Sequence, residues 1–151
     1  MNTTLQNFGY PESLLREYSY WAVLLRPQQI TLGSLIVACM DDVRAWPAMP
    51  SAAFSELKTI TSELEGTLRL TFRHDRINYL MLMMVDPHVH FHVIPRYSSP
   101  RIFDGKEFVD EAWPGPPHLA RTLSVPPDCR AKVREMLSQS WLQIPDNSIP
   151  K

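Results

Sequence analysis

Short apolar runs in the first quarter of the chain have the spacing of strands. Segments 20–25 and 30–40 are mostly apolar and are separated by the connection 26–29, so the pattern predicts two paired strands. Segment 11–18 has Pro11 and an acidic residue at its start, both favourable in a first helical turn, and it predicts a short helix. The chain is expected to open with this helix and a hairpin.

Segment 51–73 has apolar positions at three- and four-residue steps, which is the period of an α-helix. Pro47 and Pro50 end what precedes it, and Ser51 is expected to be the N-cap. The steps bring one apolar stripe to a single side of the helix, where it can pack against a sheet. The stripe consists of Phe54, Leu57, Ile60, Leu64 and Leu68.

The second half of the chain predicts two further strands and a helix. Segment 77–85 is short and almost wholly apolar, which favours a strand covered on both faces, and segment 88–97 follows as the next strand. Prolines make regular structure scarce from about 98 to 127, where we expect an ordered wrap or a functional lid. From Asp128, as N-cap, to about residue 141, apolar residues at four-residue steps predict a terminal helix.

Four sequential strands with a helix between the second and the third predict an α+β fold built on an antiparallel sheet. The length of 151 residues suits a single domain that spans residues 1–151. We expect its core at about 10–115, with the proline-rich wrap and the C-terminal helix at about 98–151.

Composition narrows the classes of function. A net charge of -1 provides no basic field for a nucleic-acid polymer, although a nucleotide needs only local donors. The first residues do not resemble a secretory signal, and no apolar run approaches the roughly 18 residues of a membrane span. Cys39 and Cys129 follow no disulfide or redox spacing, so we expect reduced thiols and a cytoplasmic location.

Three histidines at every second position, His88, His90 and His92, are the strongest chemical signal in the sequence. In a strand this spacing puts the three imidazoles on one face and the intervening apolar residues on the other. Histidine titrates near neutrality, so the row can supply a nucleophile, a proton donor and a hydrogen-bonding cation in one small site. Those are the parts required to attack a phosphorus atom and stabilise its charge.

A zinc site is the alternative interpretation of this row, because imidazole is a common zinc ligand. Along an extended strand the Cα atoms of His88 and His92 would lie about 13 Å apart, too far for one ion with bonds of about 2 Å. Asp86 and His74 are candidates to complete a site around two of the histidines, but no cysteine or glutamate stands at a zinc spacing. We therefore expect no metal ligands in the row.

The row resembles the signature of the histidine-triad (HIT) superfamily, in which three histidines alternate with apolar residues. Residues 88–94 match every position of that signature. From about residue 10 to 115 the chain looks like the bacterial, dinucleoside polyphosphate hydrolase-like branch, with Gly33 before the second strand and the motifs Pro95-Arg96-Tyr97 and Trp113-Pro114. The resemblance implies a HIT-like antiparallel sheet with a long helix between strands, and a homodimer as in many relatives.

The resemblance also implies a reaction at the α-phosphorus of a nucleotide. His90 would be the nucleophile and form a covalent nucleotidyl-histidine, which water or another acceptor then resolves. His88 would assist the leaving group as a hydrogen-bond or proton donor. His92 would hold a phosphate oxygen and help to order the site.

Outside the row, the resemblance indicates Ser34, Asn78 and Arg96 as substrate-binding residues. Ser34 stands where many members have an accessory histidine. The chain reads Leu25-Arg26-Pro27 where some members have a nucleoside-contacting asparagine. We interpret Arg26 as an exposed turn residue, with a phosphate contact as the alternative.

We therefore expect a nucleotide hydrolase or nucleotidyl transferase, with dinucleoside polyphosphates as the leading substrate class. No cofactor is needed for the covalent step, and magnesium would arrive bound to the substrate. The alternatives are a hydrolase of nucleoside phosphoramidates or aminoacyl-adenylates, a nucleotide-binding regulator without turnover, and a metal-binding protein.

Overall fold

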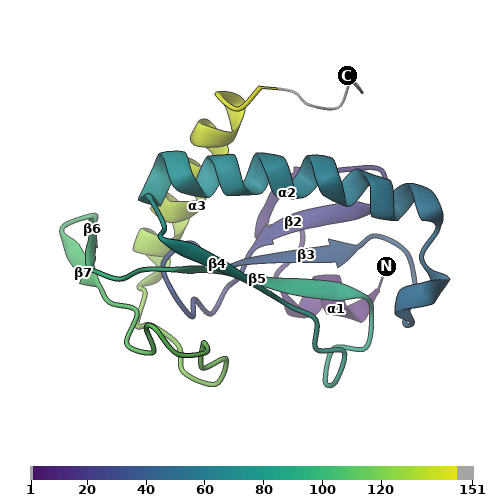
Figure 1. Cartoon of the computed structure of the whole chain (residues 1–151), viewed down its shortest axis with the longest axis horizontal. Coiled ribbons are helices and arrows are strands. Elements are labelled where there is room, and N and C mark those ends of the chain that lie inside the picture. The colour runs from purple at the N-terminus through teal and green to yellow at the C-terminus, as the bar shows by residue number, and fades with distance from the viewer. Residues whose placement is uncertain (1, 146–151) are drawn as a thin grey trace.

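A five-stranded antiparallel sheet forms the centre of the computed structural model, which describes residues 2–145 (Figure 1). Its strands lie in the order β1-β2-β3-β5-β4, and each neighbouring pair is antiparallel. A separate hairpin, β6 and β7, follows the sheet in the chain. The strands are β1 (Leu14–Glu17), β2 (Trp21–Leu25), β3 (Leu35–Cys39), β4 (Arg76–Leu80), β5 (His90–Arg96), β6 (Arg101–Phe103) and β7 (Lys106–Phe108).

Helices cover both faces of the sheet. The long helix α2 (Ser51–Phe72) connects β3 to β4 across one face, after the 3-10 turn η1 (Trp46–Ala48) (Figure 1). The short helix α1 (Thr3–Asn7) packs on the other face, and α3 (Pro127–Leu142) packs against α2. An antiparallel sheet, a long helix between strands and a C-terminal helix confirm the predicted α+β fold.

The sheet separates a large core from a small one. Val23, Val37 and Val93 point into the large core, which α2 and α3 close. The neighbours of these residues along each strand point to the opposite side of the sheet, because successive side chains of a strand alternate. That opposite side is called the α1 face below; its strand residues under α1 are Ala22, Leu24, Ile36 and Ala38.

The turn before β3 depends on Gly33. Its φ of +85° lies in the left-handed region, and a Cβ there would meet the Phe72 ring at 3.0 Å. The predicted hairpin of two strands is confirmed, but residues 30–34 form a turn and the second strand begins only at Leu35. The side chains of Gln29 and Ser34 hydrogen-bond the backbone of this turn, so its polar groups are satisfied without a ladder.

The helix predicted for residues 11–18 is wrong. Leu14–Glu17 forms the edge strand β1, in which Arg16 pairs with Val23 of β2. Helical signals at a first turn are weak, and pairing with an existing strand overrides them. The helix of this region lies earlier, at α1, where the Asn2 side chain caps it by accepting a hydrogen bond from the Leu5 amide at 2.9 Å.

The apolar segment 77–85 is an edge strand for only part of its length. β4 ends at Leu80, and one of its sides pairs with β5 while the other has no strand beside it in the described chain. Beyond it, Met84 and Val85 are 83% and 90% exposed. The prediction of a strand covered on both faces was therefore wrong, because an apolar run does not show which side of the sheet it joins.

Both predicted helix starts are displaced by one or two positions. α2 begins at Ser51 itself with Pro50 at the N-cap, and α3 begins at Pro127 with Pro126 at the N-cap. Asp128 lies in the first turn of α3, where its carboxylate interacts favourably with the helix dipole.

No helix of residues 2–145 is long and apolar enough to span a membrane. Cys39 and Cys129 are both buried free thiols.

Candidate functional site

The strand β5 places the histidines as their spacing predicts. Phe91 and Val93 belong to the large core, so His90 and His92 lie on the α1 face, opposite Ala38 and Ile36 of β3. His88 precedes the strand. The extended pairing continues there because the Val89 carbonyl accepts from the Cys39 amide at 3.0 Å. All three side chains are buried: His88, His90 and His92 are 2%, 1% and 6% exposed.

Both ring nitrogens of His88 are engaged. Nε2 lies 2.8 Å from Asp42 Oδ1, and Nδ1 lies 2.9 Å from the Thr4 hydroxyl. Hydrogen bonds from Arg44 first, and from His88 second, hold the pKa of Asp42 below its usual value, so this carboxylate is ionised and can only accept. Nε2 of His88 therefore carries a proton.

The orientation of His90 determines its tautomer. Nδ1 lies 2.6 Å from the backbone carbonyl oxygen of His88, and a carbonyl can only accept, so Nδ1 is the protonated nitrogen. In the neutral ring Nε2 then carries the lone pair. Nε2 is buried and has no hydrogen-bond partner among the residues that the structure describes. In its neutral form His90 thus presents a buried lone pair on Nε2 at the α1 face, which is what a nucleophile requires.

His92 differs from the cation expected in the row. Burial first, and then the neighbouring His90 and Arg26, lower its pKa to about 4. Its ring lies 5.1 Å from that of His90, centroid to centroid, and its buried Nδ1 has no partner within residues 2–145. In the free protein at neutral pH, His92 is therefore a neutral imidazole rather than a positive charge.

Helix α1 covers the three histidines. The ring of Phe8 lies 5.6 Å from that of His90 and 5.8 Å from that of His92. Thr4 bonds His88, and the Asn7 amide donates to Asp86 Oδ1 at 2.7 Å. Sequence reasoning missed this cover because a five-residue helix gives almost no periodic signal.

Arg26 is buried rather than exposed, contrary to the interpretation from sequence. It follows β2 on the α1 face, is 8% exposed, and donates through Nη1 to the Gln28 carbonyl. Its Nε is a further buried atom without a partner in the described chain. The sequence contained a signal for this placement. Arg26 stands two residues after Leu24, so its side chain is expected on the same face of the sheet as that of Leu24.

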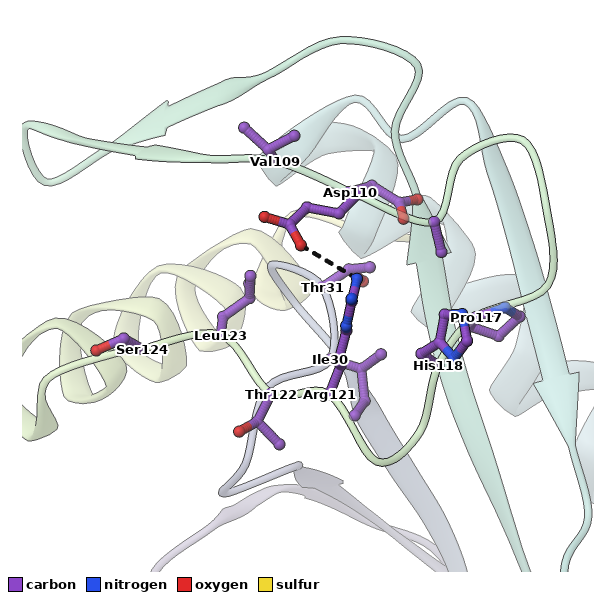
Figure 2. Close-up of a pocket in the computed structure, with 12 residues that line it drawn as sticks. Ile30, Thr31, Val109, Asp110, Pro117, His118, Arg121, Thr122, Leu123 and Ser124 are labelled. Atoms are coloured by element: carbon purple, nitrogen blue, oxygen red, sulfur yellow. Dashed lines mark hydrogen bonds and ion pairs between the residues drawn. The ribbon is translucent and has the colours of Figure 1, made fainter.

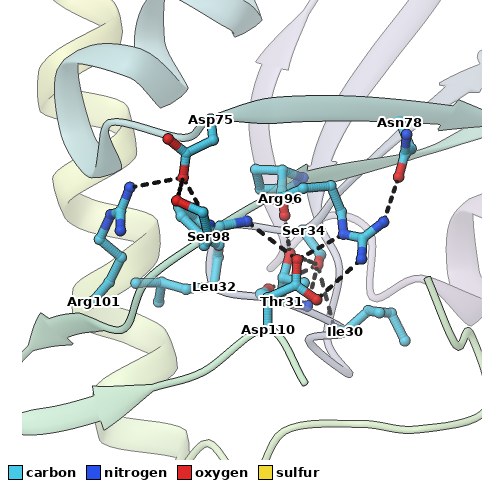
Figure 3. A network of polar contacts seen from close by, with 12 residues as sticks. Ile30, Thr31, Leu32, Ser34, Asp75, Asn78, Arg96, Ser98, Arg101 and Asp110 are labelled. Atoms are coloured by element: carbon cyan, nitrogen blue, oxygen red, sulfur yellow. Dashed lines mark hydrogen bonds and ion pairs between the residues drawn. The ribbon is translucent and has the colours of Figure 1, made fainter. Parts of the chain in front are cut away.

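Ser34, Asn78 and Arg96, the substrate-binding candidates, lie in or beside one polar network (Figure 3). Arg96 donates through Nε to Asp110 Oδ2 at 2.7 Å, through Nη2 to Asp110 Oδ1 at 3.2 Å, and through Nη1 to Asn78 Oδ1 at 2.8 Å. Ser34 is fully buried and donates to the Thr31 carbonyl at 2.8 Å. Along β5, Arg96 stands four residues beyond His92, roughly 13 Å away. The structure therefore brings these residues near one another and leaves them away from His88 and His90.

Two cavities in the described part of the chain lie beside candidate residues or their partners. A cavity of about 280 Å³ is lined by His88 with Thr3, Asp42 and Arg44, so it opens at the first histidine of the row. A second cavity, of about 440 Å³, lies under the proline-rich segment, and an ion pair of 3.4 Å joins Arg121 to Glu111 there (Figure 2). The second cavity is lined by no residue of the row.

The proline-rich segment is an ordered wrap. The Leu123 amide donates to the Gln29 carbonyl at 2.8 Å, which fastens the segment to the turn before β3. The segment also supplies Asp110, the partner of Arg96, and it contains the short hairpin β6–β7. Within residues 2–145, no group of three or more His, Cys, Asp or Glu side chains is arranged to hold a metal ion.

This sheet, with imidazoles on the face opposite its long helix, is the architecture of histidine-triad proteins, and solved structures bear this out. A histidine triad protein from Marinobacter aquaeolei VT8 is 24% identical, with 87% of this chain and 90% of that chain covered and a TM-score of 0.67. A hypothetical histidine triad nucleotide-binding protein from Sulfolobus tokodaii is 14% identical, with 93% and 90% covered and a TM-score of 0.68. A zinc-bound histidine triad family protein from Mycobacterium smegmatis is 14% identical, with 86% and 84% covered and a TM-score of 0.61.

These similarities establish the fold. The chain has the histidine-triad fold over most of its length, as the resemblance in the sequence implied. No protein-family model and no curated protein matches the sequence. Residues 88–94 are thus the part of the sequence that carries the family signature, and the fold places its three histidines on the α1 face and Val89, Phe91 and Val93 in the large core.

Proposed function

We propose that this protein is a HIT-type nucleotide hydrolase or nucleotidyl transferase that forms a covalent intermediate on His90. The observation that carries the proposal is the hydrogen bond from His90 Nδ1 to the His88 carbonyl, which leaves Nε2 as a buried lone pair. A neutral imidazole is a good nucleophile toward phosphorus, and a covalent intermediate divides one difficult displacement into two.

The reaction begins when His90 Nε2 attacks the α-phosphorus of the substrate. The bond from phosphorus to the leaving oxygen breaks with its electron pair, and that oxygen takes the proton of His88 Nε2. Water then attacks the nucleotidyl group on His90, gives a proton back to His88, and releases the nucleoside monophosphate. The ionised Asp42 orients His88 by accepting from its Nε2, so the donor nitrogen lies on the side of the 280 Å³ cavity.

Substrate access requires the cover over the row to move. His90 Nε2 is buried and the Phe8 ring packs over His90 and His92, so a phosphorus atom reaches Nε2 only when Phe8 or the whole of α1 is displaced. Polar contacts at Thr4 and Asn7 hold α1 in place, and hydrogen bonds of this kind are worth about 1 kcal/mol each. Displacing the whole of α1 would also expose the buried side chains of Leu5 and Phe8, at about 1.5–3 kcal/mol each, so a movement of Phe8 alone is the less costly route.

Dinucleoside polyphosphates are the proposed substrate class, and nucleoside phosphoramidates and aminoacyl-adenylates come second. The nucleotide-binding description of the Sulfolobus protein supports a nucleotide as ligand. We propose no resident cofactor and expect magnesium to accompany a polyphosphate substrate. With its two free cysteines the protein is proposed to work in the cytoplasm.

We also propose a homodimer formed through β4. This edge strand has no strand on its outer side in the described chain, and an unpaired edge is a template for pairing with a second copy. Next to it, Tyr79 together with Val37, Leu57 and Phe91 lines an apolar hollow that a partner could cover. Light scattering of the purified protein tests this, and a Tyr79→Glu variant should shift the population toward monomer.

A turnover screen with trapping of the intermediate tests the proposed function. The protein is incubated with diadenosine tetraphosphate, adenosine phosphoramidate and a lysyl-adenylate, products are followed by chromatography, and acid-labile adenylate adducts are sought by intact mass. We expect turnover of at least one substrate and an adduct on His90. Tight nucleotide binding without turnover or adduct would favour the regulator.

The metal-binding alternative is tested on the same preparation, since one similar protein is described as zinc-bound. We expect elemental analysis to give less than a stoichiometric amount of zinc, and a chelator to leave the thermal unfolding curve unchanged. One zinc per chain that is lost in both His88→Ala and His90→Ala variants would replace the nucleotidyl-transfer proposal.

A further inference from the structure

Arg26 is a buried cation with an incomplete set of partners. It is 8% exposed, its Nη1 donates to a backbone carbonyl, and its Nε has no hydrogen-bond partner in the part of the chain that the structure describes. Its backbone amide donates to the Ser34 carbonyl at 3.0 Å, a hydrogen bond that does not involve the guanidinium. No carboxylate of residues 2–145 forms an ion pair with the guanidinium, and Asp86 acts on it only through a longer-range attraction.

Burying a charge without a partner is costly, and proteins retain such groups where a ligand completes them. Burial lowers the pKa of Arg26, although a guanidinium still stays protonated in the physiological range. The Arg26 guanidinium is therefore positively charged in the free protein, and its Nε–H is a buried donor that an acceptor would satisfy. An anion satisfies both requirements at once.

The position of Arg26 on the sheet directs it toward the histidines. Leu24, Ile36 and His92 form one row across β2, β3 and β5 on the α1 face. Arg26 stands two residues beyond Leu24 and so points to the same face. Two strand spacings amount to about 10 Å, which a long arginine side chain spans in large part. The positive charge is felt at His92, whose pKa it helps to lower.

We propose that Arg26 binds an oxygen of the phosphoryl group that His90 attacks, and that it supplies the positive charge of this subsite. Arg26 Nε, His90 Nε2 and His92 Nδ1 are each buried without a partner in the described chain, and in this proposal the phosphoryl group is the ligand that they share. His92 is neutral in the free protein and contributes a hydrogen bond. The inference rests on the proposed function in that it takes the ligand to be a phosphate ester.

Binding of AMP and of adenosine to the full chain, measured by calorimetry, separates a phosphate contact from a nucleoside contact. We expect Arg26→Gln to weaken AMP binding about 30-fold and adenosine binding less than threefold, because one charge-assisted hydrogen bond is lost only for AMP. Arg26→Lys should give an intermediate loss, since it keeps the charge without the planar fork. Arg134→Gln is the matched control: its Nε also lacks a partner and its Nη2 also donates to a backbone carbonyl, but it lies on α3, and we expect no change.

The change that AMP causes in the pKa of His92, followed by proton NMR titration, gives a readout that a purely structural role of Arg26 would not move. Removing the charge in Arg26→Gln should raise the pKa of His92 in the free protein, and AMP should raise it in the wild type. If Arg26→Gln does not fold, Arg26→Lys is used for the binding measurement, the AMP-induced shift of the His92 pKa is measured in the wild type, and inorganic phosphate serves as a competitor of AMP.

The outcomes distinguish this inference from the proposed function. Equal losses for AMP and adenosine, or no loss for either, would overturn the role of Arg26 while leaving turnover and the adduct on His90 untouched. Conversely, a 30-fold selective loss of AMP binding in a protein without turnover would retain the phosphate subsite and remove the catalytic proposal.

Discussion

Two buried polar clusters lie along the same strand β5, and they differ in how completely their atoms are paired. At one end, Arg96 has a bidentate partner in Asp110 and a third acceptor in Asn78. At the other, His90 and His92 each have a buried nitrogen without a partner in residues 2–145. Arg96 and Asp110 are buried as the two histidines are, so burial does not explain the difference.

The comparison separates a structural role from a functional one. A satisfied buried network stabilises and orients the fold, whereas buried polar atoms left unpaired are retained where they meet a ligand. By this criterion Arg96, which the sequence suggested as a substrate contact, holds the proline-rich wrap to the sheet. Arg26, which the sequence suggested as a surface residue, belongs with the histidines.

The largest expected effect is at His90. His90→Ala should lower kcat on the best substrate of the turnover screen by about 10³-fold or more, because the attacking atom is removed. The circular dichroism spectrum should be unchanged. His118→Ala, in the cavity under the proline-rich wrap, is the control and should retain full activity. A folded His90→Ala with near-normal kcat would refute the mechanism.

Asp110→Ala should have the opposite profile, with a large effect on stability and a small one on chemistry. The Arg96 and Asp110 side chains are 4% and 3% exposed, and breaking a buried pair costs about 3–5 kcal/mol. Urea unfolding measures this loss. The exposed pair Arg121–Glu111 supplies the control, since Glu111→Ala should cost less than about 1 kcal/mol. Similarly small losses of stability in Asp110→Ala and Glu111→Ala would show that the buried Arg96–Asp110 pair does not stabilise the fold.

Acid should expose the lowered pKa of His92. The pKa is about 4 in the folded protein against an ordinary value of 6.5, so the unfolded chain binds the proton first as the pH falls. The free energy of unfolding should decrease between pH 6.5 and about pH 4, by at most about 1.4 kcal/mol per pH unit. His92→Gln should flatten this slope above about pH 5.5, where carboxylates contribute little. An unchanged slope in the variant would assign the pH dependence to another group.

Ser34→Ala should have the smallest effect. Its hydroxyl donates to the Thr31 carbonyl and accepts from the Ile30 and Thr31 amides, so the loss of these bonds should cost about 1–2 kcal/mol of stability. The value of kcat/KM, measured at a temperature where the variant is folded, should fall by no more than about tenfold. A kinetic loss as large as that of His90→Ala would place Ser34 in the catalytic machinery.

Periodicity in the sequence was sufficient for the larger elements. The stripe of segment 51–73 predicted α2 to within one residue, and the alternation of residues 88–92 predicted which side chains face the core. Both patterns are local, and their periods of 3.6 and 2 follow from backbone geometry alone. Shorter elements were missed or misassigned, because α1 and β1 are held by contacts with distant strands rather than by their own propensity.

The sequence by itself determined the chemistry that this protein carries: three imidazoles in a row, backed by apolar residues, on a strand. Only the tertiary structure decided their states. The tautomer of His90 depends on a carbonyl two residues away, the charge of His92 on burial under Phe8, and the roles of Arg26 and Arg96 on whether a carboxylate lies beside them. Hydrogen bonding and desolvation act between residues that the fold brings together, and no residue type or spacing records them in advance.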